Sequence, residues 1–160
     1  MDQCAGSESD LRKRFRSVVP TNYTPRFVYI VVQKRISTRI MMRQDGGKNV
    51  ENPPPGTILD HTVTRYEFKD FFLVPQAVNQ GTVTPTHMVV THENHPENEP
   101  ELSADIIQQL AYKLTHMYFN WPGTVRVPAL CQYAHKLCDL VGEHLKGQPS
   151  QTLNDKLYYL

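Results

Sequence analysis

The sequence predicts an α/β or α+β domain in which two helices pack against a mixed β-sheet. Short apolar, β-branched runs dominate the first part of the chain, and two segments with helical periodicity follow them. Prolines and glycines gather in the stretches between these runs. The chain has 160 residues, enough for one domain with a hydrophobic core.

Residues 1–25 are expected to form a frayed N-terminal segment or the remnant of a helix. The run at 26–33 is apolar and β-branched without strong alternation, a pattern typical of a strand covered on both faces of a parallel or mixed sheet. Few elements in this chain are left to cover both faces. The run therefore indicates a sheet completed by sequence that this chain lacks, and residues 26–160 are interpreted as part of a domain.

The other predicted elements follow from turn residues and periodicity. Three prolines and two adjacent glycines predict a loop at 44–57. Further strands are expected at 58–63, 70–76 and 87–92, with a turn or exposed edge at 80–86 and a polar loop at 93–102.

Two helices are predicted in the C-terminal part. One covers 104–119, with Ser103 as its N-cap. A short strand or extended arm at 124–127 separates it from a second helix at about 129–145, which Pro128 opens. The tail from Leu153 to Leu160 ends in apolar residues that are not expected to be left in water.

Composition matches an ordinary soluble globular protein, with 39% hydrophobic and 21% charged residues. The apolar runs are too short to span a bilayer, so no membrane partner is expected. Met1 to Asp10 holds no apolar stretch of signal-peptide type, which favours an intracellular protein. The net charge of +1 is not the global signature of a nucleic-acid binder, so such a function must rest on local clusters.

Basic residues do form two such clusters. They are Arg12, Lys13, Arg14 and Arg16, and then Lys34, Arg35, Arg39 and Arg43. Beside phosphate-handling chemistry these clusters predict salt-sensitive binding. Taken alone, they are typical of solvated faces.

Cysteines and histidines offer weaker candidates. Cys4, Cys131 and Cys138 form no C-x-x-C pair, and the last two are expected to be reduced, half-buried thiols on one helix face. His135 stands between apolar neighbours in the second predicted helix, which by itself is typical of a packed core histidine. A Cys/His hydrolase that pairs it with Cys131 or Cys138 has only helical spacing in its favour.

Short motifs in a fixed order carry a more specific signal. They are VVQKR at 31–35, PGT at 55–57, DH at 60–61, DFFL at 70–73, QGT at 80–82, PTH at 85–87, YKLTH at 112–116, NWPGTVRVP at 120–128, YAHKL at 133–137 and KLYYL at 156–160. Together they resemble the end of a PIWI domain, and more closely the PIWI clade of the Argonaute family. The resemblance covers nearly all of residues 26–160.

This resemblance implies an RNase H-like α/β fold, a mixed sheet flanked by helices that is incomplete in this chain. It also implies guide-directed RNA cleavage with Mg²⁺ or Mn²⁺ in intact members, through two aspartates, a glutamate and a histidine. The histidine matches His135, a suitable metal ligand. The carboxylates belong upstream of residue 26, where Asp2 and Asp10 are poor substitutes.

The resemblance also implies RNA contacts. Lys34, Arg35 and Arg39 match basic positions against the guide backbone, where they would position phosphates without reading bases. Arg126 and Gln132 match polar guide contacts with different residue types. The carboxylate of Leu160 matches a terminal group that helps hold a metal at the guide's 5′ phosphate.

The resemblance therefore implies a partial PIWI domain of a piRNA-type guided silencing protein. Its partners would be guide small RNA, target RNA, and the remaining PIWI, middle and PAZ domains of a parent protein. The parent would be an endonuclease in the cytoplasm, including perinuclear granules, or in the nucleus, while this chain alone would not cleave. The alternative is a short module that binds RNA or a partner without cleaving.

Overall fold

The computed structural model describes residue 13 and residues 26–43, 50–94, 101–153 and 156–160. Strands come first and helices second, as predicted. The strands are β1 (Phe27–Gln33), β2 (Met42–Arg43), β3 (Val50–Glu51), β4 (Thr57–Leu59), β5 (Lys69–Val74) and β6 (Thr86–Asn94). The helices are α2 (Ala104–Leu114), α3 (Ala129–Leu140), a π-helical turn (Val141–Leu145) and a 3₁₀ turn (Gln151–Leu153). The cluster at 12–16, apart from Lys13, and Cys4 lie outside the described residues.

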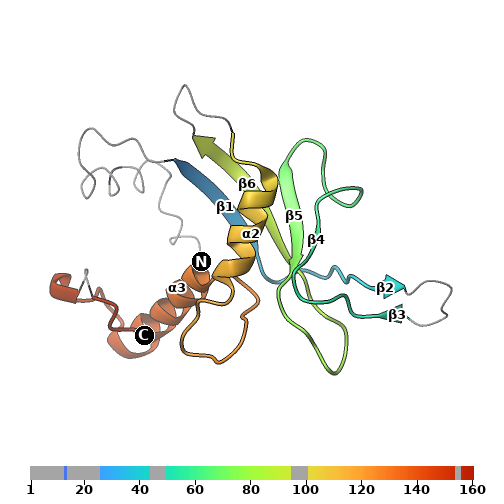
Figure 1. Cartoon of the computed structure of the whole chain (residues 1–160). Coiled ribbons are helices and arrows are strands. Elements are labelled where there is room, and N and C mark those ends of the chain that lie inside the picture. The colour runs from blue at the N-terminus through green and yellow to red at the C-terminus, as the bar shows by residue number, and fades with distance from the viewer. Residues whose placement is uncertain (1–12, 14–25, 44–49, 95–100, 154–155) are drawn as a thin grey trace.

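The main sheet has four strands in the order β1-β6-β5-β4, and every pairing among them is antiparallel. Strands β2 and β3 form a separate antiparallel ribbon. In Figure 1 this ribbon projects away from the side of the sheet where α3 lies, while α2 crosses one face of the sheet. The arrangement leaves the end of β1 close to the helical side of the molecule.

Strand β1 confirms the strand expected at 26–33, but it is not enclosed on both faces within the described structure. Val28, Ile30 and Val32 pack against the core under α2. Val31 points the other way and is 38% exposed. The apolar run is therefore a half-covered strand here, paired on one side with β6.

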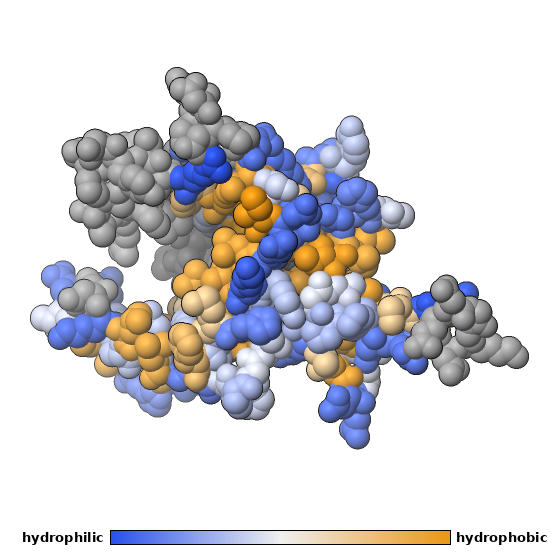
Figure 2. Space-filling view, viewed as in Figure 1, coloured by the Kyte–Doolittle hydropathy of each residue, from blue (hydrophilic) through white to orange (hydrophobic). Residues whose placement is uncertain are grey.

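The hydrophobic core lies between β5, β6 and α2. Phe71, Leu73 and Met88 from the strands meet Ile107 and Ala111, which share one face of α2 at a spacing of four residues. Helix α2 also carries Ile106 and Leu110 on an exposed face, and Figure 2 shows apolar residues reaching the surface over the middle of the molecule. Only part of the apolar face predicted for this helix is therefore buried, and the rest is exposed.

Several predicted boundaries were wrong for local reasons. Helix α2 ends at Leu114 rather than 119, because the amides of Thr115, His116 and Met117 bond three residues back. The strand expected at 58–63 stops at Leu59, since the Thr64 hydroxyl donates to the Asp60 carbonyl and turns the chain. The two-residue strands β2 and β3 were missed, and β3 lies in the predicted loop at 44–57.

The second predicted helix is confirmed as α3 with the π-helical turn after it. The polar loop expected at 93–102 begins later, because β6 continues to Asn94, and residues 95–100 lie outside the described structure. The tail does not meet its expectation, because Leu157, Tyr158 and Leu160 are exposed in this chain.

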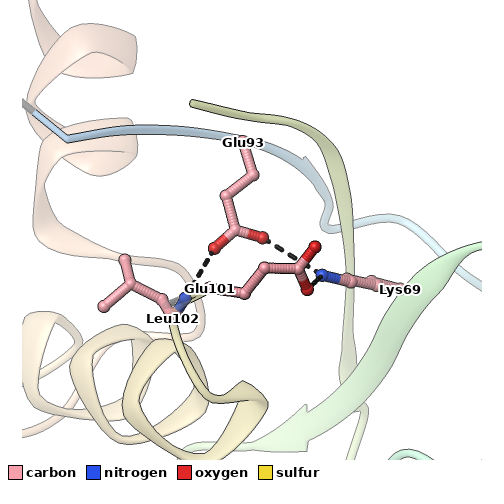
Figure 3. A network of polar contacts seen from close by, with 4 residues as sticks. All are labelled: Lys69, Glu93, Glu101 and Leu102. Atoms are coloured by element: carbon pink, nitrogen blue, oxygen red, sulfur yellow. Dashed lines mark hydrogen bonds and ion pairs between the residues drawn. The ribbon is translucent and has the colours of Figure 1, made fainter. Parts of the chain in front are cut away.

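A polar network fastens the start of α2 onto the sheet (Figure 3). The carboxylate of Glu93 on β6 accepts the Leu102 amide at 3.1 Å and the Lys69 ammonium at 3.2 Å. Lys69 on β5 also donates to Glu101 at 2.7 Å, and that hydrogen bond is the main cause that raises the pKa of Lys69. The network fixes the point from which α2 crosses the sheet. None of the helices described is long and apolar enough to cross a bilayer.

Replacing Leu73 tests the core. Leu73 is fully buried, so Leu73→Ala leaves a cavity and is expected to lower the free energy of unfolding by about 2–5 kcal/mol. The matched control is Leu110→Ala, because Leu110 is 56% exposed and surface changes stay within about 0.5 kcal/mol. Urea denaturation followed by circular dichroism measures both, and equal losses for the two variants would contradict this core.

Candidate nucleic-acid interface

The segment from Thr115 to Pro128 joins α2 to α3. One backbone bond within the segment and two side chains from outside it hold residues 124–126 in place. The Val125 amide donates to the carbonyl of buried Thr115 at 3.0 Å. The Thr86 hydroxyl donates to the Arg126 carbonyl and the Gln76 amide to the Thr124 carbonyl, each at 2.5 Å. Residues 124–127, here called the connecting arm, belong to no strand, so the short strand that was one of the two forms predicted for them is not formed.

This connecting arm, the end of β1 and α3 enclose a groove of about 590 Å³. Lys34 and Arg35 line it from directly after β1, Arg126 from the arm, and Gln132 and His135 from α3. The fold therefore brings together predicted site residues that lie far apart in the sequence. No Asp or Glu is among the described residues that line this groove, so its three fixed positive charges give it a positive potential.

His135 is not the packed core histidine that its apolar neighbours suggested. Its side chain is 48% exposed and faces the groove from α3. Its Nε2 lies 3.7 Å from Asp139 Oδ2, one turn further along the helix, and both side chains reach solvent. Such an exposed pair stabilises little and leaves the imidazole free to engage a ligand.

Two predicted site residues do not line the groove. The Arg39 guanidinium Nη1 donates to the carbonyls of Thr38 at 2.9 Å and Ile36 at 3.3 Å on the exposed segment that follows β1. The Leu160 amide donates to the Leu157 carbonyl at 3.2 Å within the exposed tail. The roles assigned to Arg39 and to the Leu160 carboxylate stay predictions.

A polar pair beside the groove was not predicted from the sequence, and it is centred on the buried carboxylate of Asp70. Its Oδ2 lies 2.7 Å from Nε2 of His87, whose Nδ1 lies 3.0 Å from Oε1 of Gln33. The His87 ring also stacks on Phe72, with centroids 4.4 Å apart. The pairing of β6 with both β1 and β5 brings these side chains together, and a hollow of about 530 Å³ beside them shares Arg35 with the groove. Strand register is the signal that would have found the pair.

Another hollow, of about 800 Å³, lies between residues 60–71 and the start of α2. It contains both acids and bases. The carboxylate of Asp60 accepts the Gln108 amide at 2.8 Å, the main cause that lowers the pKa of Asp60. Among the residues that the structure describes, no three His, Cys, Asp or Glu side chains could hold a metal ion together.

Cys131 and Cys138 form no disulfide and are exposed, not half-buried as expected, and both line a small hollow that α3 shares with Val32 and Lys34 beside the groove. Desolvation by neighbouring atoms raises the pKa of the Cys131 thiol, and the positive charge of Lys34 opposes this. A raised pKa disfavours the thiolate that a nucleophile requires. This observation weighs against the Cys/His hydrolase hypothesis.

Comparison with known proteins gives a consistent assignment. The Piwi domain family matches residues 5–146. Piwi-like protein Ago3 of Bombyx mori is 51% identical over 144 residues, which cover 90% of this chain and 15% of that protein. The chain thus spans about 15% of the length of this relative.

Solved structures agree with the sequence relatives. The crystal structure of Drosophila Piwi aligns with a TM-score of 0.73 at 41% identity, over 95% of this chain and 20% of that one. The structure of Kluyveromyces polysporus Argonaute with a guide RNA aligns with a TM-score of 0.63 at 27% identity, over 82% and 15% of the two chains. The predicted RNase H-like α/β fold class is confirmed.

The charge of Lys34 near the Cys131 thiol can be tested by alkylation. In a Cys4→Ser, Cys138→Ser background, Lys34→Met removes the positive charge that lowers the thiol pKa. The pKa then rises, and the rate of iodoacetamide alkylation at pH 8.5 is expected to fall because less thiolate is present. Mass spectrometry follows the reaction, with Lys113→Met on α2 as the control variant. An unchanged rate in Lys34→Met would show that the charge of Lys34 does not affect the pKa of the Cys131 thiol.

Proposed function

Because the chain belongs to the Piwi domain family, we propose that it is the guide-RNA-binding C-terminal part of the PIWI domain of a piRNA-type silencing protein. One observation carries this proposal: the groove gathers Lys34, Arg35, Arg126, Gln132 and His135 with no carboxylate among its described lining. Guanidinium and ammonium groups bind phosphate oxygens through charge-assisted hydrogen bonds. The structurally similar Argonaute of Kluyveromyces polysporus was solved with a guide RNA, which supports the same ligand class.

The proposed contacts are with the RNA backbone. Lys34 supplies a compact charge and the two arginines supply planar forks, all suited to phosphate oxygens. Gln132 adds an amide that can donate to a phosphate or a sugar hydroxyl. Such contacts set the position and direction of a strand without reading its sequence, so this groove would accept guides of many sequences.

His135 is proposed as the imidazole of the cleavage site in an intact parent. In the groove it is an exposed donor, and the described residues hold no complete metal site. Metal chemistry therefore needs carboxylate donors beyond these residues, and we assign Mg²⁺ or Mn²⁺ to the intact domain only. There, a divalent pair would activate water and stabilise the leaving oxygen. His135 would contribute an imidazole nitrogen from the wall of the groove.

The proposed partners are the guide small RNA, its target RNA, and the remaining PIWI, middle and PAZ domains of the parent. The parent would work in the cytoplasm, including perinuclear granules, or in the nucleus. A second function, a module that binds RNA without cleaving it, is favoured by the lack of three clustered metal donors among the described residues. Both functions use the same groove and differ only in cleavage.

The salt dependence of RNA binding tests the phosphate contacts. The chain is expected to bind single-stranded RNA with an affinity that falls as salt rises, and Lys34→Ala and Arg35→Ala should each reduce the slope of log K against log salt by about 0.7. Arg43→Ala on the projecting β2–β3 ribbon is the matched control, because Arg43 is exposed and lies outside the groove. Fluorescence anisotropy measures all three variants. If Arg43→Ala reduced the slope as much as Lys34→Ala and Arg35→Ala, the groove would not be the RNA-binding site.

Cleavage assays test the role of His135. With Mg²⁺ and guide-complementary RNA, the chain alone is expected to show no cleavage, because its described residues offer no complete set of metal donors. In a parent protein, His135→Ala should reduce cleavage by at least about 100-fold while guide binding persists, since a metal ligand is lost and the phosphate contacts remain. Cleavage by the isolated chain that disappears in its His135→Ala variant would contradict this assignment.

A further inference from the structure

Trp121 is the single tryptophan of the 160-residue chain, and nothing in the core requires it. It is 59% exposed. Much of its large apolar ring therefore stays in contact with water unless a ligand covers it. It also lines the basic groove, together with Tyr118 and Arg126. An exposed aromatic ring beside fixed positive charges is the combination that single-strand binding proteins use.

The backbone around Trp121 is held in place before any ligand arrives. Its amide donates to the Tyr118 carbonyl at 3.2 Å, and the arm that follows is fastened at Val125 to Thr115. A Cβ on Gly123 would lie 3.2 Å from Nε1 of Trp121 and 3.5 Å from its Cδ1. The edge of the indole ring therefore lies close to Gly123. Because glycine has no side chain, nothing at this residue pushes the ring away.

We propose that Trp121 is a stacking position for an unpaired nucleobase of the RNA strand whose phosphates occupy the groove. The inference rests on the proposed function, because it needs the strand to be there. The phosphates would contact Lys34, Arg35 and Arg126, and a base turned toward the arm would lie against the indole face. Every base has a π-face, so this contact adds affinity without base identity.

A neighbouring aromatic residue separates stacking in the groove from general apolar exposure. Phe119 is 81% exposed and lies two residues before Trp121, but it does not line the groove. Its contact with the fold is through the backbone, since its amide donates to the Tyr133 hydroxyl at 2.9 Å. Phe119→Ala keeps that bond and is the matched control for Trp121→Ala.

The test uses the full chain and two RNA probes, a decanucleotide and the same backbone with abasic sites. The wild-type chain should bind the decanucleotide more tightly than the abasic strand, and its tryptophan fluorescence should be quenched by the decanucleotide only. Trp121→Ala should weaken binding of the decanucleotide by at least about fivefold, the low end for loss of one base stack, and leave the abasic strand unchanged. Trp121→Phe should restore most of the preference, and Phe119→Ala should behave as wild type.

The outcomes separate the two proposals. If Lys34→Ala weakens both probes while Trp121→Ala weakens neither, the stacking proposal is overturned and the phosphate groove stands. If neither variant weakens either probe, or the chain binds no RNA, both proposals fail. Equal weakening by Trp121→Ala and Phe119→Ala would assign the effect to general apolar exposure and would also overturn the stacking role. Circular dichroism melting confirms that each variant is folded before binding is compared.

Discussion

The hydrogen bonds that fasten the connecting arm to Gln76, Thr86 and Thr115 are the constraint on which the groove depends. Thr115 and Thr86 are buried, and they and Gln76 hold the arm at three successive residues, 124, 125 and 126. Each bond contributes only about 1 kcal/mol net, but leaving such a buried polar group unpaired costs about 1–3 kcal/mol. The arm therefore has one strongly preferred position, and Trp121, Arg126 and the start of α3 are placed by it.

Charge distribution reconciles the net charge of +1 with the proposed binding of an anionic strand. Four of the described acidic side chains have other partners: Glu93 and Glu101 bind Lys69, Asp60 accepts the Gln108 amide, and Asp70 is paired with His87. The groove keeps its lysine and arginines without a carboxylate among its described lining. Local segregation of charge, not the total, is therefore what supports the proposed RNA partner.

Periodicity and turn residues predicted the elements that are long enough to carry a pattern, namely β1, β5, β6, α2 and α3. They could not predict the two-residue strands β2 and β3, because two residues carry no period. Nor could they distinguish the buried face of α2 from its exposed apolar face, because that depends on which side the sheet approaches. The elements were thus predictable from local chemistry, and their contacts were not.

The groove itself is assembled from three segments that sequence spacing does not relate. The order of short motifs identified Lys34, Arg35, Arg126, Gln132 and His135, which the fold then brought together. Trp121 and the Asp70–His87 pair were missed, since exposure and strand register are visible only in three dimensions. The opposite error occurred with Arg39. The motifs predicted it as a site residue, but the fold does not place it in the groove.

The central claim is that an RNA strand runs along the groove between β1, the arm and α3. Photo-cross-linking of the chain to single-stranded RNA that carries 4-thiouridine, followed by peptide mapping, tests it most directly. The account predicts cross-links confined to peptides that contain residues 34–35 and 118–135. Cross-links on the β2–β3 ribbon or on the hollow at residues 60–71, with none in the groove, would contradict it.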